Sequence, residues 1–201
     1  TRYRSGQVPQ YLLTHPNPED RLDYVESLIL ADHDQMPGQD AGKDFSFLRF
    51  KYRILTQTND NATVRAYLNN KLSDAGTDST GRIMAQYGLA LLDRKENNYA
   101  KALERLEIVS EKFPDRVILK TDRGVTLLDM GQLEAARDVL EDAVKQDPFD
   151  MYAVYNFAKV LHRLCQKDRA LQLFLDVSYK MSEYSDVYFD IGRILSEQGK
   201  A

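Results

Sequence analysis

The sequence predicts an all-α protein in which antiparallel helix pairs stack into an α-solenoid of about ten helices. Two recurrences support this fold class. Small residues stand at Gly124, Ala158 and Gly192, which are equally spaced along the chain, and we call this interval the repeat step. Gly131 and Gly199, two such steps apart, fall at the expected turns. A fixed step of about 34 residues is the sequence signature of stacked helix–turn–helix units.

Each recurring position has a physical role. A small residue such as Gly124 lets the first helix of a pair approach the second within the usual ~8–10 Å between axes. Ala136 and Ala170 are the small partners on the second helices. Gly131 accepts the positive φ that ends a first helix, and Pro148 stops a second helix because proline lacks the N–H that a continuing helix needs.

The earlier part of the chain follows the pattern less closely. Gly88 matches Gly124 only if the turn at residues 94–98 is two residues longer than the later turns. Before that, residues 42–75 form a degenerate pair of helices, with Ala66 at the small position.

These patterns divide the chain into two regions. Residues 1–17 contain prolines that disfavour helix and form an extended leader. Residues 18–201 form the helical repeat domain, with its clearer repeats over 79–201 and one long loop at 32–41. The expected helices span residues 18–31, 42–56, 61–74, 79–93, 97–112, 117–130, 133–146, 151–164, 167–181 and 185–199.

Three motifs resemble the tetratricopeptide repeat: Gly124-x-x-Leu127, Ala170-x-x-x-Phe174 and Pro148. The resemblance implies a solenoid whose concave face is lined by the first helix of each pair and binds other proteins or peptides. The alternative is an ordinary helical bundle in which small residues align by chance.

Counting along the repeat predicts which side chains line the concave face. Tyrosine and arginine are common anchors at protein interfaces, because they combine apolar area with directed hydrogen bonds. The alternative is that the tyrosines pack between repeats and the cations are solvated. The chain does not match the Lys/Asn pattern that grips a C-terminal carboxylate in some chaperone adaptors. The predicted partner-binding residues are Tyr152, Tyr155, Lys159, His162, Arg163, Phe189 and Arg193.

Composition and motif content argue against several other functions. The net charge is −4 and the cations are not clustered, which disfavours nucleic-acid binding. No stretch reaches the ~20 apolar residues that span a bilayer. Cys165 is the single cysteine, and no His-Glu-x-x-His, phosphate loop or serine elbow is present. We therefore expect no enzyme activity and no cofactor in this chain by itself.

The leader carries a second resemblance. Leu12, Thr14, His15, Pro16 and Arg21 resemble the junction between protease and repeats in bacterial zinc metallopeptidases of the outer-membrane β-barrel-assembly-enhancing type. The resemblance implies a periplasmic location and an upstream, zinc-dependent protease domain. It also implies that His15 reaches the catalytic zinc of that domain. The alternative is that His15 is a leader residue that binds no metal.

The functional expectation is a scaffold for protein–protein interaction. It would be the repeat domain of such a protease, and it would bind substrates or outer-membrane assembly factors. The main alternative is a free-standing tetratricopeptide adaptor in secretion or pilus assembly. We also expect self-association through the C-terminal helix, where Tyr188, Ile191 and Leu195 offer an apolar edge.

Overall fold

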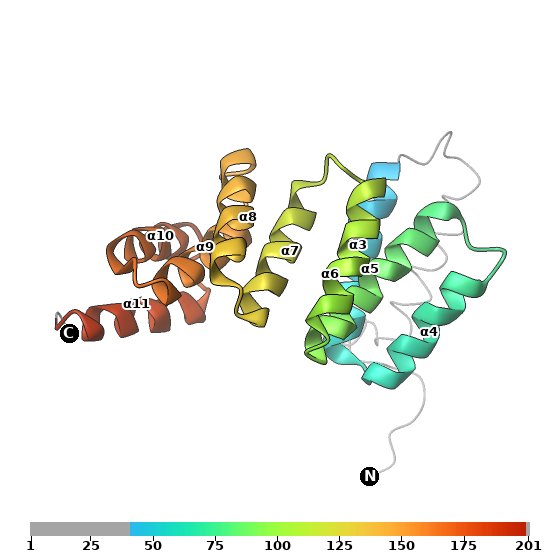
Figure 1. Cartoon of the computed structure of the whole chain (residues 1–201), viewed down its shortest axis with the longest axis horizontal. Coiled ribbons are helices and arrows are strands. Elements are labelled where there is room, and N and C mark those ends of the chain that lie inside the picture. The colour runs from blue at the N-terminus through green and yellow to red at the C-terminus, as the bar shows by residue number, and fades with distance from the viewer. Residues whose placement is uncertain (1–40, 200–201) are drawn as a thin grey trace, which may run out of the picture. The chain divides into compact units, whose positions relative to one another are not determined.

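The computed structural model describes the backbone of residues 41–199 and the side chains of residues 45–199. The chain divides into two compact units, Thr1–Lys43 and Asp44–Ala201, and the features below belong to the second. The described residues form nine helices (Figure 1): α3 (Ala41–Thr58), α4 (Asn61–Ser73), α5 (Ser79–Lys95), α6 (Tyr99–Lys112), α7 (Val117–Met130), α8 (Leu133–Gln146), α9 (Met151–Arg163), α10 (Lys167–Lys180) and α11 (Ser185–Glu197).

Nine of the ten predicted helices are therefore present, with ends within two residues of the predicted ones. The remaining predictions concern the N-terminal part of the chain. The helix at residues 18–31, the leader at 1–17 and His15 lie outside the described residues.

A left-handed residue follows each first helix from α5 onward. Asn97 (φ 62°), Gly131 (φ 84°), Cys165 (φ 61°) and Gly199 (φ 68°) follow one another at exact repeat steps. The four turns therefore stand in the same register. The prediction of a turn two residues longer at residues 94–98 was wrong.

The correct counterpart of Gly124 is Ala90, which lies one repeat step earlier and is 1% exposed. The error came from matching a glycine with a glycine, whereas the packing requires only a small side chain. Ala66 was also placed wrongly, because its side chain is exposed. Gly88 instead adjoins Leu68 of α4 and Tyr52 of α3.

The crossing of α7 and α8 shows why a small residue is required. A Cβ atom added to Gly124 would lie 2.5 Å from Cγ of Leu140. The side chain of Leu140 is fully buried against this backbone. Close approach of the two helix axes is therefore possible only because residue 124 has no side chain.

The second helices bury the same three positions in each unit. Burial of a Leu, Val or Phe side chain stabilises the fold by roughly 1.5–3 kcal/mol. Helices α5 and α6, α7 and α8, and α9 and α10 form the closest pairs, and each second helix also packs on the following first helix. The buried sets are Ala102, Leu106 and Val109; Ala136, Leu140 and Ala143; and Ala170, Phe174 and Val177.

Candidate functional site

Buried tyrosines tie successive first helices together. The hydroxyl of Tyr87 in α5 donates to Oδ2 of Asp122 in α7 at 2.9 Å. The hydroxyl of Tyr155 in α9 donates to Oδ2 of Asp190 in α11 at 2.8 Å. Burial, together with the neighbouring carboxylate, raises the pKa of both Tyr87 and Tyr155. Both hydroxyls therefore stay protonated and keep donating.

The hydrogen bond between α7 and α9 differs from these two tyrosine–aspartate bonds. Thr121 stands one repeat step from Tyr87 and one from Tyr155, and its hydroxyl donates to Asp150 at 3.1 Å. Asp150 also accepts from the backbone N–H groups of Tyr152 and Ala153, which caps the N-terminus of α9. The shorter threonine side chain thus contacts the start of the next first helix instead of its middle.

A second set of ties joins the C-terminal ends of the first helices. Arg94 Nε contacts Asp129 at 2.6 Å, and His162 Nε2 contacts Glu197 at 3.1 Å. Arg163 Nη1 donates to the carbonyl of Leu128 at 2.9 Å. Each of these pairs is 35 residues apart, as are the two tyrosine pairs. We call the surface formed by these tied faces of α5, α7, α9 and α11 the first-helix face.

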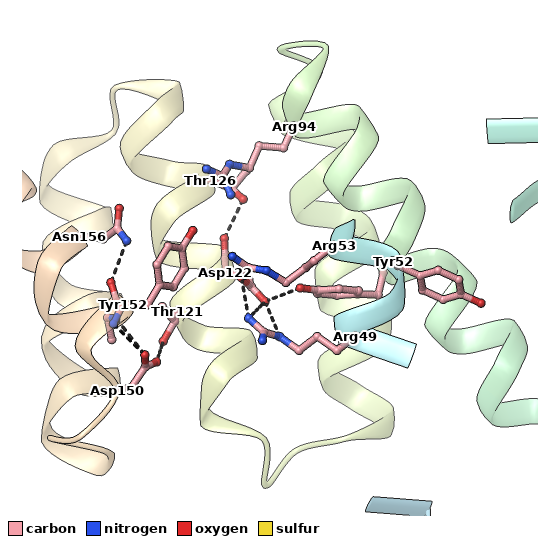
Figure 2. A network of polar contacts seen from close by, with 12 residues as sticks. Arg49, Tyr52, Arg53, Arg94, Thr121, Asp122, Thr126, Asp150, Tyr152 and Asn156 are labelled. Carbon is pink, nitrogen blue, oxygen red and sulfur yellow. Dashed lines mark hydrogen bonds and ion pairs between the residues drawn. The ribbon is translucent and has the colours of Figure 1, made fainter. Parts of the chain in front are cut away.

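Helix α3 docks on this face through its arginines (Figure 2). Arg49 contacts both carboxylate oxygens of Asp122 at 3.1–3.3 Å, and Arg53 Nη1 lies 3.5 Å from the same carboxylate. The guanidinium of Arg53 also lies 5.0 Å from the ring centre of Tyr152 in α9. One helix therefore contacts α7 and α9 by side chains, and the buried ring of Tyr52 lies beside Gly88 of α5.

A pocket of about 610 Å³ opens where α3 meets the C-terminal ends of α5 and α7. Its wall combines apolar surface with three cations and one carboxylate. The α5–α6 turn, α6 and α9 complete the wall. The lining residues are Arg53, Thr56, Gln57, Leu91, Arg94, Lys95, Asn97, Tyr99, Asp129 and Tyr152.

Existing contacts hold the cations of the pocket in position. Lys95 Nζ donates to the backbone carbonyl of Thr56 at 2.8 Å, near the end of α3. Arg94 uses Nε to contact Asp129, and the side chains of these two residues are 27% and 35% exposed. Because the pair is partly exposed, solvent and ligands can reach it.

Of the predicted partner-binding residues, Tyr152 lines this pocket. Tyr155 is 6% exposed and holds α11 through Asp190. Lys159 places its ammonium 5.5 Å from the ring centre of Tyr155. Arg163 is bonded to the carbonyl of Leu128. Tyr155 and Arg163 therefore contribute mainly to the stacking of the helices, whereas the contact of Lys159 with the Tyr155 ring lies within α9.

The other predicted residues gather around α11. His162 lies between Glu197 and Arg193, with its Nδ1 3.2 Å from Arg193 Nη2. Arg193 also pairs with Asp190 at 2.7 Å and lies over the ring of Phe189. Phe189 is 73% exposed and stands at the repeat position of Tyr155. This group is separate from the lining of the pocket.

Sequence reasoning missed Arg53, Arg94, Lys95 and Asp129. A signal for two of them was available, because Arg94 and Lys95 precede His162 and Arg163 by two repeat steps. The two-residue error in the register of α5 hid this correspondence. Arg53 lies in the degenerate unit, where the repeat does not predict the position of α3.

Residues 41–199 contain neither a metal centre nor a membrane-spanning helix. No group of three or more His, Cys, Asp or Glu side chains in this part of the chain is arranged to hold a metal ion. None of the helices described there has the length and apolar character needed to cross a bilayer.

Comparison with known proteins identifies the repeats. The tetratricopeptide-repeat family profile matches residues 87–150 and 121–186. No curated protein sequence gives a significant match. Residues 87–186 are therefore tetratricopeptide repeats, and the predicted all-α solenoid of helix pairs is confirmed.

Several solved structures share the fold. MamA is 19% identical with a TM-score of 0.51, and the alignment covers 59% of this chain and 64% of that chain, slightly less than two thirds. YrrB, described as a TPR protein with an unusual peptide-binding site, is 18% identical with a TM-score of 0.53, covering 81% and 85%. A putative kinesin light chain of Podospora anserina is 15% identical with a TM-score of 0.55, covering 81% and 90%.

Proposed function

We propose that this tetratricopeptide-repeat chain is a protein-interaction scaffold, and that it receives a segment of its partner in the pocket between α3 and the first-helix face. The observation that carries the proposal is the pocket itself. Its volume of about 610 Å³ falls in the ~300–1,000 Å³ range of ligand-binding clefts. Helices from distant parts of the chain contribute to its wall.

The chemistry of the wall suits a peptide. Leu91, Tyr99 and Tyr152 offer apolar surface, while Arg53 and Arg94 offer directed donors. Tyrosine and arginine are enriched among the residues that dominate binding energy at protein interfaces. The ties to Asp122 and Asp129 hold the arginines before a ligand arrives, which lowers the entropy lost on binding.

A peptide array of unbiased composition tests this function. The full chain is labelled and applied beside two variants in the pocket, Tyr152→Ala and Arg53→Glu. Lys120→Glu is the control, because Lys120 pairs with Asp142 outside the pocket at 2.7 Å. We expect discrete peptide binders that both pocket variants lose and the control retains. Absence of any binder, or equal binding by all variants, contradicts the proposal.

The finer proposal concerns the parent protein. We propose that the chain is the repeat region of a periplasmic zinc metallopeptidase that acts in outer-membrane protein assembly or quality control. The support is the run of Leu12, Thr14, His15, Pro16 and Arg21 in the leader. In the parent, His15 would bind the zinc of the protease domain and fill the coordination position that otherwise holds water.

Two measurements decide between this parent and a free-standing adaptor. A His-Glu-x-x-His helix encoded upstream of Thr1 supports the protease, and its absence supports an adaptor in secretion or pilus assembly. Where the helix is found, a His15→Ala variant of the full-length protein should alter zinc affinity and cleavage. Unchanged affinity and cleavage contradict the role of His15.

A further inference from the structure

We infer that the segment received by the pocket is acidic. When the segment binds, one of its side-chain carboxylates replaces Asp129 as the partner of Arg94. This inference rests on the proposed function and names the chemistry of the partner. It follows from the charges of the pocket, from the exposure of its ion pairs and from the donors that those pairs leave unused.

The pocket is positive although the chain as a whole is negative. Arg53, Arg94 and Lys95 line it, against the single carboxylate of Asp129. Arg53 contacts a second carboxylate, Asp122, but shares it with Arg49. The four cations and two carboxylates sum to +2, whereas the whole chain carries −4. Electrostatic complementarity therefore favours a negative ligand at this place.

Helix ends account for only part of this charge. Cations are favoured at helix C-termini because the terminal carbonyls carry partial negative charge. Lys95 contacts such a carbonyl, that of Thr56 in α3. The end carbonyls of α5 and α7 already accept backbone N–H groups, from Glu96 to Leu92 and from Gly131 to Leu128. Capping of helix ends thus explains Lys95 but not the guanidiniums of Arg53 and Arg94.

The two carboxylates differ in how easily a ligand can replace them. Asp122 is 2% exposed and accepts from Tyr87 as well as from Arg49 and Arg53. Asp129 is 35% exposed, and its contact is with Arg94 alone among the described side chains. A partly exposed ion pair of this kind contributes little net stability, so exchange of one carboxylate for another is easy.

Arg94 has capacity for a second carboxylate. A guanidinium binds a carboxylate best through two parallel N–H donors. Arg94 uses Nε for Asp129, and its terminal nitrogens pair with no other carboxylate among the described residues. A ligand carboxylate can therefore first engage the terminal nitrogens, and its repulsion of Asp129 across the same guanidinium then favours displacement of Asp129 from Arg94.

The apolar walls add a further requirement. Leu91, Tyr99 and Tyr152 line the pocket together with the cations, and a segment of acidic residues alone would leave these apolar surfaces without contacts. The matching ligand alternates Asp or Glu with aliphatic or aromatic residues.

Fluorescence anisotropy with the full chain tests the inference. The probe is a short labelled peptide in which Glu alternates with Leu, and its counterpart has Gln in place of every Glu. We expect the Gln peptide to bind about tenfold more weakly, because it lacks the charge that the arginines recognise. Amidation of the C-terminus should leave binding unchanged, because the recognised groups are side chains. Equal binding by the Gln peptide, or loss on amidation, overturns the inference.

Variants with matched charge changes locate the effect. Arg94→Gln should weaken binding of the acidic peptide about tenfold, and Asp129→Asn should strengthen it severalfold by removing the competing carboxylate. Lys120→Gln and Asp142→Asn make the same charge changes outside the pocket and should have little effect. Circular dichroism confirms folding. Weaker binding by Asp129→Asn, or an equal gain from Asp142→Asn, overturns the inference.

The array described above separates the two proposals. If it gives binders without any preference for acidic peptides, the acidic ligand is wrong and the scaffold function stands. If it gives no binder at all, the proposed function fails first.

Discussion

The hydroxyl of Tyr155 donates to Asp190 across the α9–α11 contact at 2.8 Å, and this bond repeats the Tyr87–Asp122 bond of 2.9 Å between α5 and α7. In both pairs the acceptor follows the donor by 35 residues, one more than the repeat step. The bonds therefore join neighbouring first helices in the same register. They stabilise the packing of one helix pair on the next more than the packing within any one pair.

The two bonds should differ in their contribution to stability. Tyr155→Phe leaves Asp190, 5% exposed, with Arg193 as its remaining side-chain partner. Tyr87→Phe leaves Asp122 with both Arg49 and Arg53. We expect Tyr155→Phe to lower the free energy of unfolding by about 1–3 kcal/mol, and Tyr87→Phe by less. Urea denaturation measures both, and an equal or reversed order would contradict this account.

Two glycines at equivalent positions should respond oppositely to alanine. In Gly124→Ala the new Cβ atom meets Leu140 at 2.5 Å, so we expect a loss of about 1–3 kcal/mol from overpacking. Gly192 has no atom within 4 Å of such a Cβ, and alanine is the better helix former by about 1 kcal/mol. Thermal denaturation of both variants should show destabilisation at residue 124 only.

The left-handed turn residues carry strain that glycine removes. Cys165 adopts φ 61° and Asn97 adopts φ 62°. This region costs most residues roughly 1–2 kcal/mol but is easier for asparagine. Cys165→Gly should therefore raise the melting temperature more than Asn97→Gly does. The opposite change, Gly131→Ala at φ 84°, introduces a side chain in this conformation and should lower the melting temperature.

Acid should loosen the contact between α11 and the preceding unit. Hydrogen bonds from Lys167 and His162 lower the pKa of Glu197 from 4.5 to about 2. A carboxylate whose pKa is lowered by folding contributes stability above its unfolded pKa, and this contribution is lost as the pH falls through the folded value. We expect the wild-type protein to have a higher free energy of unfolding than Glu197→Gln above pH 4.5, and this difference to disappear between pH 4.5 and pH 2. A difference in stability that is independent of pH would exclude this role.

The C-terminal helix keeps an open apolar face. Tyr188 is 48% exposed, and the space beside Gly192 is empty of described atoms, whereas the equivalent Ala158 is fully buried. We predict that two copies associate through this face. Sedimentation equilibrium should show a concentration-dependent dimer that Tyr188→Glu abolishes. A monomer at all concentrations would contradict the prediction.

The repeat predicted the helices well because their determinants are local. Gly124, Ala136 and Leu140 recur in type at fixed spacing, and small or large side chains there decide how two adjacent helices pack. The prediction failed at Gly88, because Gly88 was matched with Gly124 as another glycine although it does not lie one repeat step before it. Burial of Ala90 shows that the step was the better guide.

The sequence by itself determined the all-α class, the ends of nine helices to within two residues and the tetratricopeptide step, because these depend on contacts between neighbouring segments. Only the tertiary structure decided which residues come together to form the pocket. Its wall requires Arg53 of α3 to meet Tyr152 of α9, although these residues are far apart in the chain. No local pattern encodes that meeting, since α3 departs from the repeat and its position depends on Tyr52, Arg49 and the buried carboxylate of Asp122.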